Sequence, residues 1–454
     1  MGLITKGGIL IPNNDFTTAL FNLNADDIES FDDYLVEETF HYNVKLKYKH
    51  YDCPYCGGKT TGHGVKEKLI HHPNVVGFDG IIHYYARRFR CNDCGRTFFE
   101  TNPFTFENFT NSYAVIDRVM KALGRLDLSI KRIAELNHIS VGTVLLYLDS
   151  YVAIPRPSLP ESMAIDELHS KMARRDSAYL CILIDNELRC PFDVLNSRSK
   201  HNLNVHFEKY SKSERDKVKY VTIDMWQPYK DVALRQFKNC KIAVDPFHVV
   251  KNLCDAFSKI RVTIMNQSPY GSDAYYLLKS FHFLLEKRDV NLDSEPQYNK
   301  HFSRKLSLRQ IKEMIFDISD KLFDSYNLKC DYQFFNDNAT IDNCAEWLDR
   351  LILKFQSTYI IEYREFSALL INWRVEIINS FLRPFGDRKL SNSLAENING
   401  KLRTYLSLSN GIHNFTRFRK RVLLALNRKI TYAISGVISS DKEQKRKDSK
   451  ASFY

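Results

Sequence analysis

The pattern of hydrophobic and polar positions changes several times along the chain. Residues 42–100 contain alternating runs such as IIHYYARRFR, which are typical of half-buried strands. Residues 112–152 show helical periodicity, whereas the region beyond residue 160 begins with short, continuous apolar runs. From about residue 249 to 390 the pattern is almost wholly helical, with many aromatic residues. These shifts predict several domains that differ in secondary structure.

Five short apolar runs predict the strands of one α/β domain. They cover residues 163–166, 178–185, 190–197, 219–224 and 240–245, and residues 228–237 predict a helix between the last two. Ahead of them, YVAIPRPSLPESM (151–163) contains three prolines. Proline fixes φ and disfavours a helix before it, so this stretch predicts a boundary between domains.

The two ends of the chain have their own character. The acidic stretch DDIESFDDYLVEE (26–38) predicts a short surface helix within a mixed segment, 1–44. A last helical region is predicted over 391–431, and the charged tail SSDKEQKRKDSKASFY (439–454) predicts disorder.

Composition narrows the partners and the compartment. The net charge of +11 favours a polyanion such as nucleic acid, or an anionic membrane surface, although a merely basic protein remains an alternative. A run of about 18 apolar residues, as a membrane span needs, does not occur. The first residues, MGLITKGGILIPNNDF, lack a cleavable signal pattern. We therefore expect a cytoplasmic, nucleoid-associated protein without a membrane span, whose ten cysteines do not form structural disulfides.

Four of the cysteines form two CxxC pairs, each followed by a glycine. The pairs are Cys53 with Cys56 and Cys91 with Cys94. A CxxC turn aims two thiolates at one point, and zinc takes four such ligands in a tetrahedron. The glycines allow each turn to fold back beneath the metal. We predict one structural Zn²⁺ ion here; the alternative is four unrelated core cysteines.

The segment LSIKRIAELNHISVGTVLLYLDSY (128–151) predicts a helix, a short turn and a second helix. Ser129 and Ser140 are the expected N-caps, residues 137–139 form the turn, and residues 111–123 form a preceding support helix. This pattern is typical of a helix-turn-helix that lays its second helix in the DNA major groove, although other helical hairpins look alike. Ser140 and Thr143 are the candidate DNA contacts at the start of that helix.

Two basic clusters are further candidates for contacts with phosphates. An alternative for each is a solvated basic face. The first surrounds the second CxxC pair, and the second lies in HNFTRFRKRVLLALNRK (413–429). The candidate residues are Arg87, Arg88, Arg90 and Arg96 in the first cluster, and Arg417, Arg419, Lys420 and Arg421 in the second.

Three carboxylates carry the candidate chemistry. Asp166 and Asp224 each end an apolar strand, and Glu396 lies in SNSLAENINGKLRTYL (391–406), where it shares a helical face with Asn392 and Asn399. Such oxygen ligands suit Mg²⁺, and two ions about 4 Å apart activate the attacking oxygen and stabilise the leaving one in phosphodiester chemistry. The alternatives are that the aspartates are turn or cap residues and that Glu396 completes a capping box.

The order of these features is specific in combination. A CxxC…CxxC ribbon, a helix-turn-helix and then the short motifs IDE, TID, DPFH and AEN resemble the bacterial transposases of the insertion-sequence-L-three type. The resemblance extends from about residue 40 to 430. It implies a multidomain α/β protein with an N-terminal zinc ribbon, a helix-turn-helix and a ribonuclease-H-like catalytic core that carries a large all-helical insertion.

The resemblance also implies domain boundaries and roles. Asp166, Asp224 and Glu396 match the catalytic triad, and Asp245 and His248 in DPFH match an auxiliary signature, with Asp245 an alternative second metal ligand. Together with the composition of the two ends, the predicted domains are the N-terminal segment 1–44, zinc ribbon 45–105, helix-turn-helix 110–152, first part of the core 160–248, helical insertion 249–390, glutamate helix and basic C-terminal helices 391–435, and disordered tail 436–454.

The implied activity is DNA transposition with two Mg²⁺ or Mn²⁺ ions. Water cuts a phosphodiester at the element end, and the freed 3′-OH then attacks target DNA. The partners are double-stranded element ends and target DNA, bound by a homodimer or a higher homo-oligomer. The alternatives are a non-catalytic, sequence-specific DNA-binding regulator and a ribonuclease-H-like nuclease that does not join strands.

Overall fold

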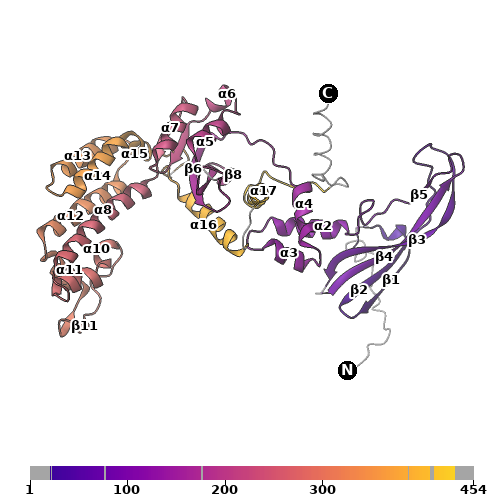
Figure 1. Cartoon of the computed structure of the whole chain (residues 1–454), viewed down its shortest axis with the longest axis horizontal. Helices are drawn as coiled ribbons and strands as arrows, with labels where there is room; N and C mark the ends of the chain where they lie inside the picture. The colour runs from indigo at the N-terminus through magenta and orange to yellow at the C-terminus, as the bar shows by residue number, and fades with distance from the viewer. Residues whose placement is uncertain are drawn as a thin grey trace. The chain divides into compact units, whose positions relative to one another are not determined.

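The computed structural model describes residues 21, 23–75, 78–174, 177–386, 388–409 and 414–434, which include no part of the predicted disordered tail 436–454. The chain divides into two compact units (Figure 1). One unit comprises residues 1–156 together with 401–454, and the other comprises residues 157–400. The division at Arg156 and Pro157 lies in the stretch of three prolines that predicts a domain boundary.

A five-stranded sheet forms the first part of the smaller unit. Its strands follow the order β1-β2-β4-β3, and β5 pairs with β4. Strand β4, in a long antiparallel pair with β3, carries the alternating run IIHYYARRFR. Its residues Ile82 and Tyr84 are fully buried, as is Val44 of β2. The bounds are β1 Ile28–Val36, β2 Thr39–Leu46, β3 Thr60–Val75, β4 Phe78–Cys91 and β5 Thr97–Phe99.

The helix predicted over 26–38 is wrong: apart from a 3-10 turn at Ala25–Asp27, this stretch forms strand β1. Phe31 lies opposite Val44 across the antiparallel β1–β2 pair. The acidic groups find cross-strand donors on β2, since Lys45 Nζ lies 2.5 Å from Glu29 Oε1. A weak local preference for helix is therefore overridden by pairing with a neighbouring strand.

Four complete α-helices lie in the described part of the smaller unit. Serine side chains cap three of them as expected for N-caps: Ser112, Ser129 and Ser140 accept from backbone N–H groups three residues on. The residue after Asn137, His138, has a φ of 49° and makes the tight turn between the second and third helices. The bounds are α2 Tyr113–Leu123, α3 Ile130–Leu136, α4 Val141–Tyr151 and α17 Phe415–Leu426.

The larger unit is built on a second five-stranded sheet, with the order β10-β9-β6-β7-β8. β6, β7 and β8 pair antiparallel in succession, whereas β9 and β10 run parallel to β6. The five strands and the helix between the last two agree with the sequence prediction. The bounds are β6 Ser162–His169, β7 Tyr179–Asp185, β8 Cys190–Leu195, α5 Lys200–Phe207, α6 Lys212–Arg215, β9 Tyr220–Ile223, α7 Gln227–Gln236 and β10 Lys241–Val244.

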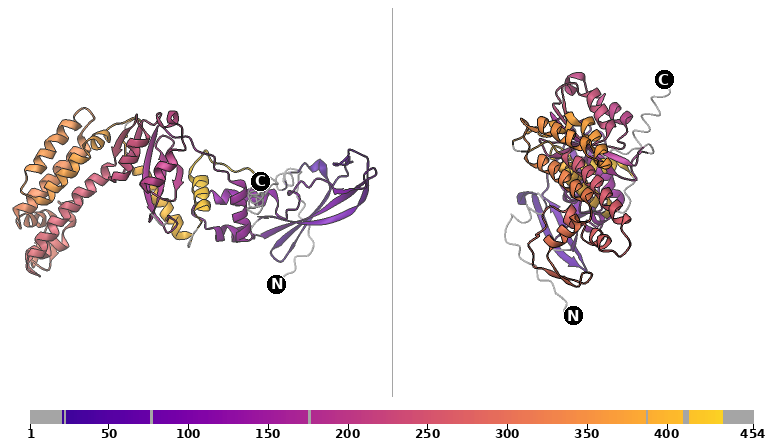
Figure 2. Two further views of the ribbon diagram at one scale, coloured as in Figure 1. Left: turned by 45° about the horizontal axis from the view of Figure 1, so that its top comes forward. Right: turned by 90° about the vertical axis from the view of Figure 1, so that its left-hand side faces the viewer.

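The predicted helical stretch 249–390 is confirmed as helical, and it forms a bundle at one end of this sheet (Figure 2). The longest helix, α8, leaves β10 directly and packs against α12 and α14. The bundle also contains a small hairpin, β11–β12, that the helical pattern did not predict. The bounds are α8 Pro246–Gln267, α9 Asp273–Ser280, α10 Phe283–Glu286, β11 Gln297–Asn299, β12 Arg304–Leu306, α11 Leu308–Phe316, α12 Asp320–Asn338, α13 Cys344–Ser357, α14 Ile361–Asn372 and α15 Arg374–Asn379.

One further helix, α16 (Ser393–Leu408), follows the bundle and returns the chain to β6 (Figure 1). Among the described helices, none combines the length and the apolar character that a membrane crossing requires.

Candidate functional site

Strand register brings three aspartates to one level of the larger sheet. Ile165 of β6 pairs with Ile223 of β9, which in turn pairs with Val244 of β10. The next residue on each of these parallel strands is Asp166, Asp224 and Asp245, respectively. Equivalent positions on adjacent parallel strands project their side chains to the same face of a sheet. The three carboxyl groups therefore lie side by side, and all three are buried.

Asp166 does not end its strand as the sequence suggested. β6 continues to His169, because residues 166–169 keep pairing with β7 beyond the last partner on β9. Asp224 and Asp245 do lie immediately after β9 and β10. Asp166 thus stands where β6 loses one of its two neighbouring strands, which leaves room beside it for other groups.

Charge repulsion and burial strongly perturb this cluster. Burial, followed by the charge of Asp224, raises the pKa of Asp166 from 3.8 to about 7. Burial likewise raises the pKa of Asp245 to about 6. His248 Nε2 lies 3.0 Å from Asp224 Oδ1, and this hydrogen bond raises the pKa of His248. Asp224, Asp245 and His248 offer ligand atoms within 4.8 Å of one another.

Helix α16 and the residue directly before it, Asn392, supply two amides to these acids. Asn392 Nδ2 donates to Asp224 Oδ1 at 3.0 Å, and Asn399 Nδ2 donates to Asp166 Oδ2 at 2.8 Å. Glu396 lies four residues after Asn392 and three before Asn399, so the helix places all three on one face. Glu396 itself is exposed and is not part of the close group formed by Asp224, Asp245 and His248.

The sequence placed Asn392 and Asn399 on the face of Glu396 but gave them no role. The sequence feature that points to these asparagines is their helical spacing from Glu396. Their hydrogen bonds to Asp166 and Asp224 are visible only in the structure. Each amide donates to a carboxylate, which favours its ionised form.

The oxygens of this site fit divalent cations. In the described part of the chain, the buried Oδ2 of Asp245 and Oδ1 atoms of Asn392 and Asn399 have no hydrogen-bond donor. Buried acceptors of this kind usually have a partner. Carboxylate and amide oxygens are hard ligands of the type that Mg²⁺ prefers, and a cation would offset the repulsion that raises the pKa of Asp166.

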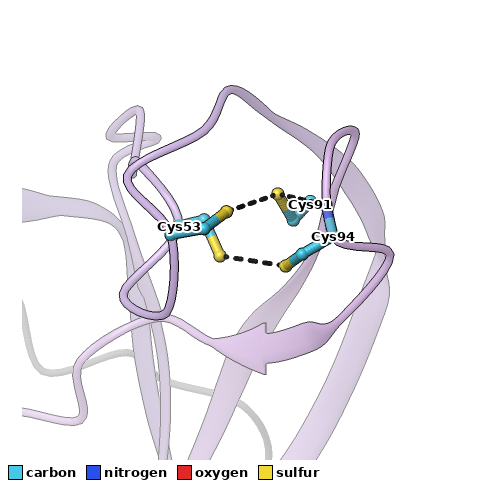
Figure 3. A group of neighbouring side chains, drawn as sticks. Cys53, Cys91 and Cys94 are labelled. Carbon is cyan, nitrogen blue, oxygen red and sulfur yellow. Dashed lines mark hydrogen bonds between the residues drawn. The ribbon is translucent and has the colours of Figure 1, made fainter.

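The four cysteines of the smaller unit converge as predicted (Figure 3). The sulfur of Cys53 lies 3.7 Å from that of Cys94, and the sulfur of Cys56 lies 3.5 Å from that of Cys91. The backbone N–H groups of Cys94 and Asp93 both donate to the Cys91 sulfur, and they lower the pKa of this thiol to about 7.

Both cysteine turns have the same backbone geometry. Gly57 N–H donates to Cys53 O and Gly95 N–H donates to Cys91 O, at 2.8 and 3.2 Å. The two glycines have φ angles of +74° and +67°, a region in which other residues are strained. Two matched turns with converging thiols are the geometry of a tetrahedral Cys₄ zinc site.

Comparisons with known proteins match the two parts of the chain that contain these residues. A family model for the DDE transposase of the ISL3 type, described as a transposase, matches residues 163–422, which is more than half of the chain. The chain belongs to the ISL3 family of transposases. A second model, the zinc-finger of the transposases of IS204, IS1001, IS1096 and IS1165, matches residues 51–94 of this ISL3-family chain.

A curated relative of this ISL3-family chain is the transposase for insertion sequence element IS1001 of Bordetella parapertussis. It is 25% identical over 251 residues, which cover 54% of this chain and 60% of the relative. The chain therefore matches somewhat less than two thirds of that relative's length.

One of the arginines predicted to contact DNA, Arg421, lies inside the ISL3-family fold, and a second, Arg87, is half-buried. Arg421 is fully buried, and its guanidinium donates to the carbonyl oxygens of Leu123, Arg125 and Leu128. The side chain of Arg87 is 11% exposed, and it pairs with Glu29 at 2.5 Å. The guanidinium of Arg421 is buried and its donors are used internally, so it cannot reach a phosphate and that prediction is wrong. Arg87 is half-buried and remains a predicted phosphate contact.

The other candidates divide between surface and interior roles. Arg417 donates to the carboxylate of Asp149 at 2.7 Å and Lys420 to its carbonyl oxygen at 2.7 Å, so both hold α17 against α4. Thr143 Oγ1 lies 2.9 Å from Ser140 Oγ in the cap of α4. Arg88, Arg90 and Arg96 are exposed near the cysteine turns, and Arg419 is half-buried.

Proposed function

We propose that this ISL3-family protein binds the terminal inverted repeats of its insertion sequence and catalyses DNA cleavage and strand transfer with two divalent metal ions. The observation that carries the proposal is the row of buried acids made by Asp166, Asp224 and Asp245 on three parallel strands. Burying like charges together is costly unless cations neutralise them, so the arrangement is better suited to metal chemistry than to structural support.

The core is assigned as ribonuclease-H-like on its strand order. Three antiparallel strands in succession, β6, β7 and β8, are joined on the β6 side by two parallel strands, β9 and β10. The first aspartate lies on the first strand and the second directly follows the fourth. Glu396 then arrives on α16, after the helical bundle, which makes the bundle the insertion of this core.

In this proposal each residue has a defined task. Asp166, Asp224 and Glu396 hold the ions, which when bound supply the positive charge that activates the attacking oxygen and stabilises the leaving one. Asn392 and Asn399 keep Asp224 and Asp166 oriented through amide hydrogen bonds.

The DPFH signature supplies the auxiliary groups. Asp245 adds a buried carboxylate beside Asp224, and His248 donates to Asp224 from the first turn of α8. Its raised pKa favours the imidazolium, whose charge suits a phosphate neighbour.

DNA recognition is assigned to the smaller unit. The capped helices α3 and α4, with the turn at His138, support the helix-turn-helix, and the exposed start of α4 is the element proposed to enter the major groove. Arg88, Arg90 and Arg96 extend this surface around the zinc turns as phosphate contacts. Assembly as a homodimer or higher oligomer on paired element ends is part of the same proposal.

A cleavage and joining assay tests this proposal. The full-length protein, loaded with zinc, is mixed with labelled DNA from the ends that flank its gene, in Mg²⁺ or Mn²⁺. We expect cutting at the element end and joining to target DNA. Asp166→Asn, Asp224→Asn and Glu396→Gln should still bind the ends but lose at least about 10³-fold in cutting rate, as removal of an essential charge-stabilising group does.

The outcomes separate the alternatives. Asp185→Asn is the matched control, because Asp185 is buried in the same sheet and, within the described residues, accepts from the Glu187 and Leu188 N–H groups rather than from a group of the acid site. Binding without cutting in either metal would favour a DNA-binding regulator. Cutting without joining would favour a nuclease. Loss of activity in Asp185→Asn equal to that in Asp166→Asn would remove the case for a specific catalytic role.

A further inference from the structure

Two neighbouring cavities lie in the larger unit, around the start of β7. One has a volume of about 360 Å³ and is lined by Tyr179, Arg198, Lys200 and Trp226 among others. The second, of about 430 Å³, includes Lys171 and Arg174 in its lining. The two cavities share Ser177 and Ala178 in their linings, and four basic side chains line one or the other of them.

Arg198 is the centre of a planar array in the first cavity. Its guanidinium carbon lies 4.1 Å from the ring centre of Tyr179 and 4.3 Å from that of Trp226. One of its nitrogens donates to Glu167. Cation–π contacts with two rings and an ion pair together hold the guanidinium in place, with the aromatic groups at the cavity wall.

The array is attached to the catalytic acids through the backbone. Glu167 is the residue after Asp166 on β6, and the Trp226 N–H donates to the carbonyl oxygen of Asp224 at 2.7 Å. Two residues of chain span at most about 7 Å, so the Cα atom of Trp226 lies within that distance of the Cα atom of Asp224. A DNA strand whose phosphate sits at the acids therefore has its neighbouring nucleotides within reach of this cavity.

We propose that the two cavities form a subsite for an unpaired, single-stranded segment of the DNA strand that is cut. The inference rests on the proposed function and deepens it by naming the form of DNA that the site holds. A base packs against the planar groups of Tyr179, Arg198 and Trp226, and the basic side chains of both cavities hold the flanking phosphates. Aromatic faces combined with a basic groove are the recurrent means of binding single strands.

A paired duplex fits the aromatic part of this subsite less well than a single strand does. Bases in a duplex are stacked on one another, so an aromatic group in a recess can reach a base only after it leaves the stack. Phosphate contacts alone would require the basic residues but neither ring. The aromatic part of the subsite therefore distinguishes single-strand binding from general attraction to DNA.

Binding to two matched probes tests the subsite. The first probe is a blunt fluorescein-labelled duplex of the element end, and the second is the same duplex with a six-nucleotide single-stranded extension past the cleavage point. Both are titrated with the full-length, zinc-loaded protein in Ca²⁺, with fluorescence anisotropy as the readout. We expect the extension to tighten binding by about tenfold or more, the effect of stacking one or more bases on aromatic groups.

Conservative variants identify the source of that preference. Trp226→Leu should reduce the preference to within about twofold, whereas Trp226→Phe keeps a ring and should retain most of it. Arg198→Lys keeps the charge opposite Glu167 but not the planar group, and should also lose preference. Trp347→Phe, a change in the partly buried tryptophan of α13, is the control and should match the wild type.

Photo-cross-linking gives an independent readout of the same contact. With 5-iododeoxyuridine placed at successive extension positions, we expect one or two positions to cross-link to the peptide that contains Trp226 or Tyr179. Equal binding of both probes by the wild type, or a preference that survives Trp226→Leu, would overturn the subsite while leaving the transposase proposal intact. Failure of the wild type to bind either probe would instead count against the proposed function itself.

Discussion

In the metal-free protein, replacement of Asp166 by asparagine is expected to stabilise the larger unit, and more so at pH 8 than at pH 5. Burial and the charge of Asp224 raise the pKa of Asp166 from 3.8 to about 7 in the folded state. A raised acid pKa means that the folded state binds the proton more tightly than the unfolded chain. Its stabilising effect is fully present below pH 3.8 and is lost as the pH rises to about 7.

The size of the effect follows from that shift. A shift of about three pH units corresponds to roughly 4 kcal/mol between the two protonation states, and near pH 5 only about 1 to 2 kcal/mol of it is already expressed. Asparagine carries no charge, and its amide oxygen can still accept from the Asn399 amide that now donates to Asp166. The gain in unfolding free energy from Asp166→Asn should therefore grow by about 2 to 3 kcal/mol between pH 5 and pH 8.

Urea unfolding monitored by tryptophan fluorescence measures this gain in the right part of the molecule. All three tryptophans, at positions 226, 347 and 373, lie in the larger unit, so their signal follows that unit. Addition of Mg²⁺ should stabilise the wild type more than the variant, because the variant has lost a ligand charge.

Asp185→Asn is the control for this measurement. Asp185→Asn removes a charge that accepts two backbone N–H bonds, each of 2.9 Å, so it should show no gain at pH 8. An Asp166→Asn gain that is the same at pH 5 and pH 8, or a loss of stability at pH 8, would refute the claim that burial and the charge of Asp224 raise the pKa of Asp166.

Three further predictions concern the zinc turns, the Asn399 amide of α16 and the interior of the smaller unit. Metal analysis of Cys94→Ser should show that bound zinc falls from one ion per chain to none, and retained zinc would contradict the Cys₄ site. The variant should also bind the element ends more weakly, while the unfolding midpoint monitored by tryptophan fluorescence stays unchanged. Asn399→Asp places a further carboxylate against Asp166, so the cleavage rate should fall at least about 100-fold while DNA binding stays unchanged. The pH–rate profile of the remaining activity should move to higher pH, because the added charge raises the pKa of Asp166. A profile that does not move would exclude a positioning role for Asn399. Arg421→Leu leaves the three carbonyl oxygens that accept hydrogen bonds from Arg421 without this donor, which costs about 1 to 3 kcal/mol for each oxygen. Circular dichroism should therefore show that the smaller unit unfolds at a much lower urea concentration. Arg90→Gln, at an exposed position, is the control and should have little effect.

Local pattern was sufficient for much of the secondary structure and for the zinc ligands. Apolar runs gave the five strands of the larger sheet, because strands buried on both faces need continuous hydrophobic residues. Ser129 and Ser140 marked the helix starts, because a cap is decided by a few adjacent residues. The CxxC spacing likewise fixed which thiols meet, since each pair closes within a single turn.

Predictions from local sequence pattern were wrong where contacts with residues distant in sequence decide the structure. The acidic stretch at 28–36 forms a strand because Lys45 and Val44 lie opposite it, and neither contact is visible in its own composition. Arg421 looks like a phosphate contact in sequence, but the fold surrounds it with internal acceptors. A basic residue carries no local sign of whether its side chain points inward or outward.

The sequence by itself determined the family resemblance, the order of the elements and the residue types able to hold metal. The tertiary structure decided which of those residues stand together. Only the parallel register of β6, β9 and β10 sets Asp166, Asp224 and Asp245 at one level, and only the return of α16 to β6 brings Asn399 to Asp166 across 233 residues of sequence. Likewise, Tyr179, Arg198 and Trp226 come from separate loops and strand ends, so their cation–π contacts have no signal in the sequence. The physical reason is that strand pairing and helix packing are long-range contacts, whereas spacing along the chain reports only what lies within a turn or two.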